Sequence, residues 1–348
     1  MNPVLVDVWR GEWVESQHRG SLAVVDAEGA LVLALGDIER PVYPRSAVKA
    51  LQALPLVASG AAARFGLSDA ELAQACASHS GEPAHVATSA GLLAKLGLDA
   101  GALECGAHWP RAEAQIAAMG ARGEAPTALH NNCSGKHAGF LCLGCVLAGE
   151  QDRRAFLRGY VEPEHPVMRE VTAALAAATD ADLSRAPVGT DGCSIPTYGI
   201  PLRQLALGFA RFGSGQGLGA DHAQAARRLR QAVAAEPFHV AGTNRLDTVL
   251  MQALGERLFC KVGAEGVYCA ALPERGWGLA IKMDDGNTAR AVEVALAACV
   301  QALLRLNEDE QALLQRHSEL AQRNWNGRLV GRLAATAGLR ATLQTLTG

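Results

Sequence analysis

The stretch "SLAVVDAEGALVLALG", residues 21–36, holds two runs of alternating apolar residues on either side of a turn. Ala27, Glu28 and Gly29 supply the turn signal, and alternation on both sides of such a signal is typical of paired strands. The stretch therefore predicts a β-hairpin near the N-terminus, and the fold depends on where the hairpin finds partner strands.

Three further strands are predicted late in the chain, in "ERLFCKVG" (256–263), "GVYCAALPE" (266–274) and "GWGLAIKMDDG" (276–286). Short turns that contain Gly or Pro join them. A sustained apolar helical face follows in residues 287–306. The simplest assembly pairs the hairpin with these strands in one antiparallel sheet, which this last helix covers.

The middle of the chain is mainly helical. Residues 68–77 begin with a capping box of Ser68 and Glu71. Residues 165–178 place a proline in their first turn, and residues 220–235 form a third predicted helix. These segments favour a mixed α/β (α+β) fold in which helices are inserted between the strands of the sheet.

We expect one domain over residues 1–348, with a sheet lobe of residues 1–45 and 240–348 and a mainly helical lobe of residues 46–239. A chain of 348 residues is long enough to bury a large core. Clefts between lobes are common places for small-molecule sites. Three polar stretches of the sequence could line such a cleft.

The composition favours a small-molecule partner. The formal net charge is -3, and acidic and basic residues are interspersed, so neither nucleic acid nor an anionic membrane surface is indicated. The chain has no run of about twenty apolar residues, and its first residues lack the sections of a signal peptide. Its nine cysteines are an odd number and lie mostly in apolar runs, as in a reduced protein. We therefore expect a cytoplasmic location.

The first polar stretch is "YPRSAVKALQ", residues 43–52. Ser46 and Lys49 are three positions apart and share one face of a helix. In such an S-x-x-K pair, a neutral and desolvated lysine can take the serine proton and create a nucleophile. The alternative is a helix cap followed by a solvated lysine. The apolar flanks argue for a buried lysine, because burial lowers the pKa of the amine.

The second stretch, "CASHSGE" (76–82), offers the hydroxyls of Ser78 and Ser80 at a helix end. Alternatively, these groups only satisfy the carbonyls of the helix terminus. The third stretch, "FCKVGAEG" (259–266), places Lys261 at a strand end. A K-x-G strand beside S-x-x-K is the arrangement of serine β-lactamases and penicillin-binding proteins. The chain has no S-D-N or Y-x-N motif, which argues against a penicillin-recognising enzyme of the usual type.

The densest polar stretch is "HNNCSGKHAG", residues 130–139. Cys133 and Lys136 are three apart and could face one ion, and Cys193 could reach the same ion from a distant loop. Cys133 and Cys193 differ from the other cysteines because Ser and Gly flank them. The alternative is a Gly-containing loop whose amides cap the backbone.

Seven motifs together give a more specific signal than any one of them, and they occur in order between about residue 5 and residue 290. They are "VESQHRGSLAVVD", "YPRSAVKALQ", "ASHSGEPAH", "HNNCSGKHAGFL", "VGTDGCSIPTYG", "AGTNRLDTVLM" and "KVGAEGVY". In this combination the chain resembles the L-asparaginases of the thermolabile rhizobial type. The resemblance implies a serine β-lactamase-like fold, hydrolysis of L-asparagine to L-aspartate and ammonia, a homodimer and a zinc ion (Zn2+).

Position by position, the resemblance assigns Ser46 and Lys49 to one Ser-Lys tandem and Ser78 and Lys261 to a second. Lys282 competes with Lys261, and Ser80 competes with Ser78, because each pair lies in one region of the chain. Either tandem could supply the nucleophile, and we favour Ser46. The mechanism expected is acyl transfer through an acyl-enzyme.

The same resemblance assigns the zinc ligands to Cys133, Lys136 and Cys193. Arg45 and Asp191 become candidates for binding the charged groups of the substrate, together with Ser80. Two other functions stay open. One is a different amidohydrolase, esterase or β-lactam-interacting enzyme of the same fold. The other is a non-catalytic zinc or thiol module that responds to metal or redox state.

Overall fold

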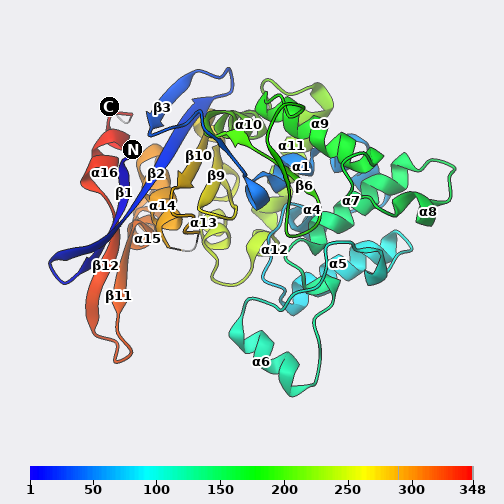
Figure 1. The fold of residues 1–348 in the computed structure, drawn as a ribbon, viewed down its shortest axis with the longest axis horizontal. Helices are drawn as coiled ribbons and strands as arrows, with labels where there is room; N and C mark the ends of the chain where they lie inside the picture. Colours follow the sequence, from blue (N-terminus) through cyan, green and yellow to red (C-terminus); the bar gives the residue numbers. More distant parts are fainter. Residues whose placement is uncertain (289, 347–348) are drawn as a thin grey trace.

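The computed structural model describes residues 1–288 and 290–346. It shows a mixed α/β fold with one eight-stranded antiparallel sheet (Figure 1). Strands from both ends of the chain form this sheet, and a largely helical region is inserted between them. No helix in the described ranges is long and apolar enough to cross a membrane.

The strand order in the sheet is β11-β12-β1-β2-β10-β9-β8, and β3 pairs with β2. The bounds are β1 (Val4–Arg10), β2 (Trp13–Asp26), β3 (Leu31–Leu35), β8 (Phe259–Val262), β9 (Val267–Leu272), β10 (Trp277–Met283), β11 (Glu319–Arg323) and β12 (Leu329–Ala335). Two short pairs lie apart, β4 (Pro41–Val42) with β7 (Ile200–Pro201) and β5 (Val188–Thr190) with β6 (Pro196–Tyr198).

The predicted hairpin is confirmed as β2 and β3, with Leu22 opposite Leu35. β2 also pairs with β10, where Ser21 lies opposite Lys282, so the hairpin and the late strands do share one sheet. The first half of β2 pairs instead with β1. The sequence patterns did not reveal β1, β11 and β12, which extend the sheet on that side.

Sixteen α-helices occur among the described residues. They are α1 (Lys49–Gln52), α2 (Leu54–Ala58), α3 (Ala61–Arg64), α4 (Asp69–Ala75), α5 (Pro83–Lys95), α6 (Glu113–Ala121), α7 (Ser134–Leu147), α8 (Arg153–Leu157), α9 (Pro166–Thr179), α10 (Leu202–Ser214), α11 (Ala220–Ala235), α12 (Phe238–Ala241), α13 (Leu246–Leu254), α14 (Ala291–Leu303), α15 (Glu308–Ser318) and α16 (Ala337–Gln344). Short 3-10 turns include η1 (Arg45–Val48).

Three predicted helices are confirmed. The capping box of α4 is present, with the Ser68 hydroxyl accepting from the Glu71 amide. α9 begins at Pro166, and α11 spans the predicted residues 220–235. The last predicted helix is α14, which is shorter than residues 287–306 at both ends, and residue 289 lies outside the described residues.

Close packing places the helices against the sheet. α10 packs on β10 and β2, and a Cβ on Gly278 would overlap the carbonyl oxygen of Ala206, so only glycine permits this approach. α14 packs against β9, β10, β1 and β12. α7 is buried on all sides through most of its length, as expected for a central helix that is apolar all round. Its N-terminal turn carries the polar residues of the densest motif.

Candidate active site

A cavity of about 420 Å3 gathers six residues that the sequence singled out. They are Arg45, Ser46, Ser78, Cys133, Asp191 and Cys193. These residues come from η1, the loop after α4, the start of α7 and the loop between β5 and β6. Residues 262–264, at the end of β8 and just after it, also line the cavity. Segments far apart in the sequence therefore converge here.

Lys49 is 1% exposed, and its amine contacts two of the predicted site residues, Ser78 and Cys133. Lys49 Nζ lies 3.0 Å from Ser78 Oγ and 3.0 Å from Cys133 Sγ, and it donates to the Ala77 carbonyl at 2.5 Å. Burial lowers the pKa of Lys49, and the neighbouring Cys133 acts in the opposite direction. The amine is thus dehydrated and held directly against a serine hydroxyl.

Ser46 lines the same cavity, at the start of the turn that leads into α1, and it is partly exposed. Within the described ranges no hydrogen bond joins Ser46 Oγ to Lys49 Nζ, so the amine is directed to Ser78 instead. Arg45 has a φ of 51°, in the left-handed region that residues with a Cβ rarely adopt. Such local strain is often found at functional sites.

Lys261 is completely buried on β8, and its amine donates to the Val262 carbonyl at 2.8 Å. Burial lowers the pKa of Lys261 to about 7, with Asp247 acting against this change. Asp247 is also buried, and it accepts a hydrogen bond from the Val262 amide at 2.8 Å. The competing Lys282 is half-buried, bonds to the Glu265 carbonyl and lines a separate pocket.

Two thiols and a carboxylate meet at one point of the cavity. One ligand atom from each of Cys133, Asp191 and Cys193 lies within 4.8 Å of the other two. Lys136 Nζ lies 3.0 Å from Cys193 Sγ. Three or four donors this close can surround one ion, so this group could hold a metal.

The two thiols affect each other's ionisation. Cys193 lowers the pKa of Cys133 well below its usual value, and Lys49 and Lys136 lower it further, against the effect of burial. Cys133 and burial raise the pKa of Cys193. Burial alone would lower the pKa of Lys136, but Cys193, Cys133 and Asp191 together raise it. These shifts favour the thiolate form of Cys133 and the charged form of Lys136.

Arg45 and Asp191 form an ion pair with each other at the cavity wall. Burial raises the pKa of Asp191, but Lys136, Cys193 and Arg45 outweigh this effect and hold it at about 2. The Cys193 thiol donates to the second carboxylate oxygen at 3.1 Å. Asp191 thus connects Arg45 to the thiol group.

Not all polar groups in and just after the second motif face the cavity. Ser80 Oγ donates to the Ala241 carbonyl at 2.8 Å, and Ser80 is absent from the cavity lining. Glu82 accepts from Thr243, while His85 contacts the Phe238 carbonyl. These three residues therefore bind α12 and the loop after it, and they do not satisfy the carbonyls of their own helix end.

Sequence reasoning missed two lining residues, His108 and Arg111. They belong to the segment between α5 and α7. This segment contains α6, which lies at its tip, away from the rest of the protein (Figure 1). His108 Nε2 accepts from the Asn132 amide at 2.8 Å, which ties this segment to the start of α7. No spacing or motif marks "HWPR" in the sequence, so only the fold reveals its position.

No curated protein matches the chain. The model of the family described as L-asparaginase II matches residues 6–335, which is nearly the whole chain. Members of this family are amidohydrolases, and membership implies hydrolysis of asparagine. A serine, a dehydrated lysine and a cavity for a small substrate agree with that chemistry, and the chain belongs to the L-asparaginase II family.

Proposed function

We propose that the protein hydrolyses L-asparagine to L-aspartate and ammonia through an acyl-enzyme formed on Ser46. Family membership supports the substrate. The observation that carries the mechanism is the direct contact of the buried Lys49 amine with a serine hydroxyl of the cavity, at 3.0 Å. A dehydrated lysine in this position is suited to accept and return a proton.

The exposure of the two serines supports Ser46 as the nucleophile. Ser78 is 2% exposed and held by Lys49, whereas Ser46 is partly exposed at the cavity wall. A nucleophile must reach the substrate carbon, while a relay must only pass a proton. We therefore assign attack to Ser46 and proton relay to Ser78, between Ser46 and neutral Lys49.

The proton balance follows from this assignment. Ser46 Oγ bonds to the side-chain carboxamide carbon and loses its proton toward Lys49. The carboxamide C–N bond then breaks, and the leaving ammonia takes a proton from a lysine. A water molecule hydrolyses the resulting ester and restores Ser46. Lys261, with a pKa of about 7, is the second amine available for these transfers.

A zinc ion is the metal that best suits the donor set. Cys133 and Cys193 supply sulfur, which zinc prefers, and Lys136 or Asp191 completes the set. The lowered pKa of Cys133 fits this role, since a thiolate is the ligating form. Lys136 would have to lose its proton to ligate. When bound, zinc would supply a positive charge that keeps the thiolates ionised and fixes the loop of Asp191.

Three structural properties belong to the same proposal. The fold is serine β-lactamase-like, supported by an S-x-x-K turn next to the cavity and a lysine on the strand that ends the sheet order. Residues 46–239 form the helical lobe and residues 1–45 and 240–348 the sheet lobe of one domain. The functional unit is a homodimer, which rests on the resemblance to rhizobial asparaginases.

Ammonia release from L-asparagine, L-glutamine and a penicillin tests the function, with Ser46→Ala and Ser78→Ala beside the wild type. We expect turnover of asparagine, and a loss of about 10³-fold or more in Ser46→Ala, as for nucleophiles that act with a partner base. A smaller loss in Ser46→Ala than in Ser78→Ala would exchange the roles of the two serines. No turnover by metal-replete wild type would overturn the proposal, and acylation by penicillin would support the related alternative.

A further inference from the structure

Asparagine carries an α-carboxylate that an asparaginase must recognise, and a cation is the natural partner. Most cations at the cavity already have a partner within the protein. Arg45 is paired with Asp191. Lys136 contacts Cys193, and Lys49 acts as a neutral amine in the proposed mechanism. None of these three groups therefore offers an unpaired positive charge to the substrate.

Arg111 is different, because it lines the cavity and its guanidinium makes no hydrogen bond or ion pair with any described residue. Arg111 is exposed, so an entering molecule can reach it. The positive charge of Arg245 acts on Arg111, and the negative charge of Asp247 acts in the opposite direction. An anion bound directly at Arg111 would offset the remaining repulsion from Arg245.

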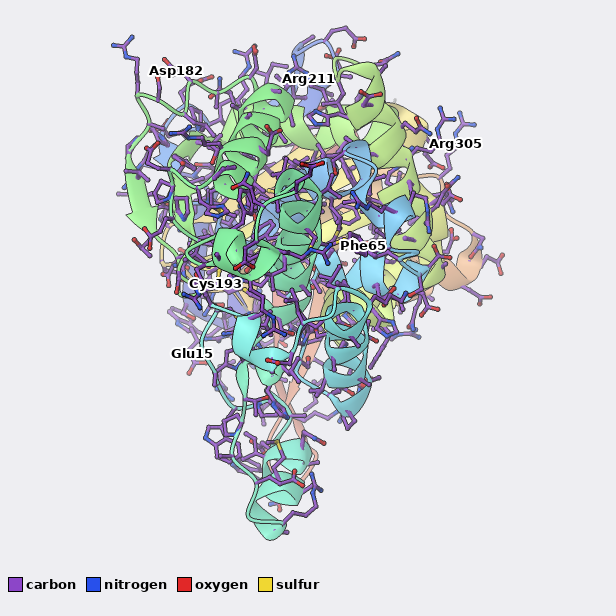
Figure 2. All side chains as sticks on the ribbon, turned by 90° about the vertical axis from the view of Figure 1, so that its right-hand side faces the viewer. Glu15, Phe65, Asp182, Cys193, Arg211 and Arg305 are labelled. Atoms are coloured by element: carbon purple, nitrogen blue, oxygen red, sulfur yellow. The ribbon has the colours of Figure 1, made fainter. Side chains whose placement is uncertain are left out.

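The position of Arg111 is fixed although its segment extends from the body of the protein. α6, at the tip of the segment, lies apart from the other helices (Figure 1), and in a view turned by 90° it lies well below the labelled Cys193 (Figure 2). The base of the segment is tied down, since the Arg111 amide donates to the Ser80 carbonyl at 3.0 Å. Asn131 holds the other side by donating to the Cys105 and Gly106 carbonyls at 2.8 and 3.1 Å.

A second contact fixes the same base. Gly81 has a φ of 73°, and a Cβ there would lie 2.9 Å from the His130 carbonyl oxygen and 3.3 Å from Pro110 Cα. Both ends of the segment therefore pack directly on the loop that carries Ser78. Arg111 is next to Pro110, so its backbone keeps a constant position relative to the serine.

We infer that Arg111 is a specificity-determining residue that binds the α-carboxylate of the substrate. The inference rests on the proposed function, because it assigns a role toward the amino-acid portion of asparagine. It also predicts how the enzyme rejects other amides: a carboxamide without a carboxylate at the right distance leaves Arg111 unpaired. Arg45 stays a structural partner of Asp191.

Two asparagine analogues separate the charged groups of the substrate. Succinamic acid retains the carboxylate and lacks the ammonium group, whereas β-alaninamide retains the ammonium group and lacks the carboxylate. Both are assayed as substrates and as competitive inhibitors of asparagine hydrolysis, so that inhibition constants exist even when turnover is slow. The variants are Arg111→Gln and Arg111→Lys, with Arg122→Gln on the same segment as the matched control.

For Arg111→Gln we expect a 30- to 100-fold lower kcat/KM for asparagine, mostly through KM, as for loss of one charge-assisted contact (about 2–3 kcal/mol). The inhibition constant of succinamic acid should rise by a similar factor, and that of β-alaninamide should stay within twofold. Arg111→Lys should recover part of the loss. Arg122→Gln should match the wild type, because Arg122 pairs with Glu124 at the exposed end of α6.

Equal loss for both analogues, or no loss for succinamic acid, would overturn the inference while the proposed function stands. If the wild type releases no ammonia from asparagine, the proposed function fails. Binding of L-asparagine to the wild type and to Arg111→Gln, measured by calorimetry, then still decides the inference, because equal affinity or absence of binding contradicts it. Melting temperatures of all variants show whether any loss comes from unfolding.

Discussion

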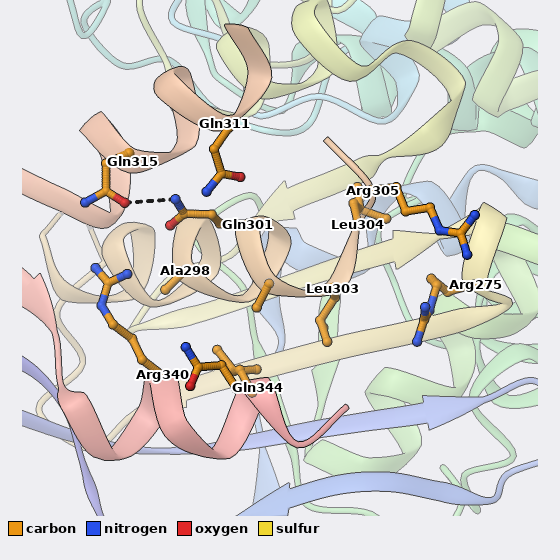
Figure 3. Close-up of a pocket in the computed structure, with 12 residues that line it drawn as sticks. Arg275, Ala298, Gln301, Leu303, Leu304, Arg305, Gln311, Gln315, Arg340 and Gln344 are labelled. Carbon is orange, nitrogen blue, oxygen red and sulfur yellow. Dashed lines mark hydrogen bonds between the residues drawn. The ribbon is translucent and has the colours of Figure 1, made fainter. Parts of the chain in front are cut away.

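Two cavities of the molecule differ in a way that indicates where its chemistry lies. The larger one, about 540 Å3, lies between α14, α15 and α16 (Figure 3). Arginines and glutamines line it, including Arg305, Arg340 and a Gln301 that donates to Gln315 at 2.9 Å. The smaller one, about 420 Å3, is the candidate active site. Cavity size therefore does not identify the site of reaction.

The difference lies in the burial of titratable groups. Lys49, Lys136 and Lys261 are each 3% exposed or less, and all three lie at or next to the smaller cavity. Removing a charged amine from water costs several kcal/mol unless a partner compensates it. The arginines of the larger cavity are more accessible, since Arg305 is exposed and Arg275 and Arg340 are only half-buried. Perturbed and buried groups in a cavity are typical of functional sites, and only the smaller cavity has them.

The strongest test of this comparison removes a thiol from the smaller cavity. Cys193→Ala should lose bound metal and lower kcat/KM for asparagine by at least about 100-fold, because Lys136 and Asp191 lose their common partner. Metal content by elemental analysis and ammonia release measure the two effects. Treatment of the wild type with a chelator should give the same change in activity, and added zinc should reverse it.

Cys299→Ala is the control for that variant. Cys299 is completely buried on α14, as Cys193 is nearly buried in the site, but it lies in the apolar core. Its loss should change stability slightly and leave metal content and activity unchanged. Full activity in metal-free Cys193→Ala would show that the thiol cluster is only structural.

The sequence predicted much of the fold because its local patterns are strong. Alternating apolar residues predicted β2, β3 and the late strands. The capping box predicted the start of α4, and the proline predicted the start of α9. β11 was missed, since it is an edge strand with alternating exposed and half-buried residues and has little apolar signal. β1 and β12 lie at opposite ends of the sequence and pair with each other, and a local sequence pattern cannot predict a pairing between such distant segments.

The sequence predicted several of the residues that form the candidate site, but it did not predict which of their side chains contact one another. The motifs named Ser46, Lys49, Cys133 and Cys193, and the fold places all of them at one cavity or against it. The spacing of S-x-x-K suggested that Lys49 serves Ser46, whereas its amine contacts Ser78. A lysine side chain is long and flexible, so the position of its Cα does not determine which distant residue its amine meets.

The next test uses the pKa of Lys261, which burial lowers to about 7. If neutral Lys261 takes part in proton transfer, kcat/KM should fall as pH decreases through about 7, by about tenfold per pH unit below it. Asp247 raises the pKa of Lys261, so Asp247→Asn should move this limb to lower pH. The measurement is the pH profile of asparagine hydrolysis, with Lys282→Met as a control that should keep the wild-type profile.

Stability gives a second view of the same lysine, independent of catalysis. The folded pKa of about 7 lies below the unfolded value of about 10.4, so the unfolded chain binds more protons between these values. Stability then rises with pH in this window and falls as pH decreases toward 7. Lys261→Met should show a smaller rise, measured by urea unfolding at several pH values. An unchanged slope would place the lowered pKa in doubt.

The smallest effect is expected in the larger cavity. Arg305 is exposed on the loop after α14, so Arg305→Gln should change the free energy of unfolding by no more than about 0.5 kcal/mol. Ammonia release should stay within twofold of the wild type, because no buried titratable group depends on this side chain. A change in KM for asparagine would mean that the larger cavity is coupled to the site despite its more accessible charges. Burial of charge would then be insufficient to distinguish the two cavities, since a pocket that alters KM is itself functional.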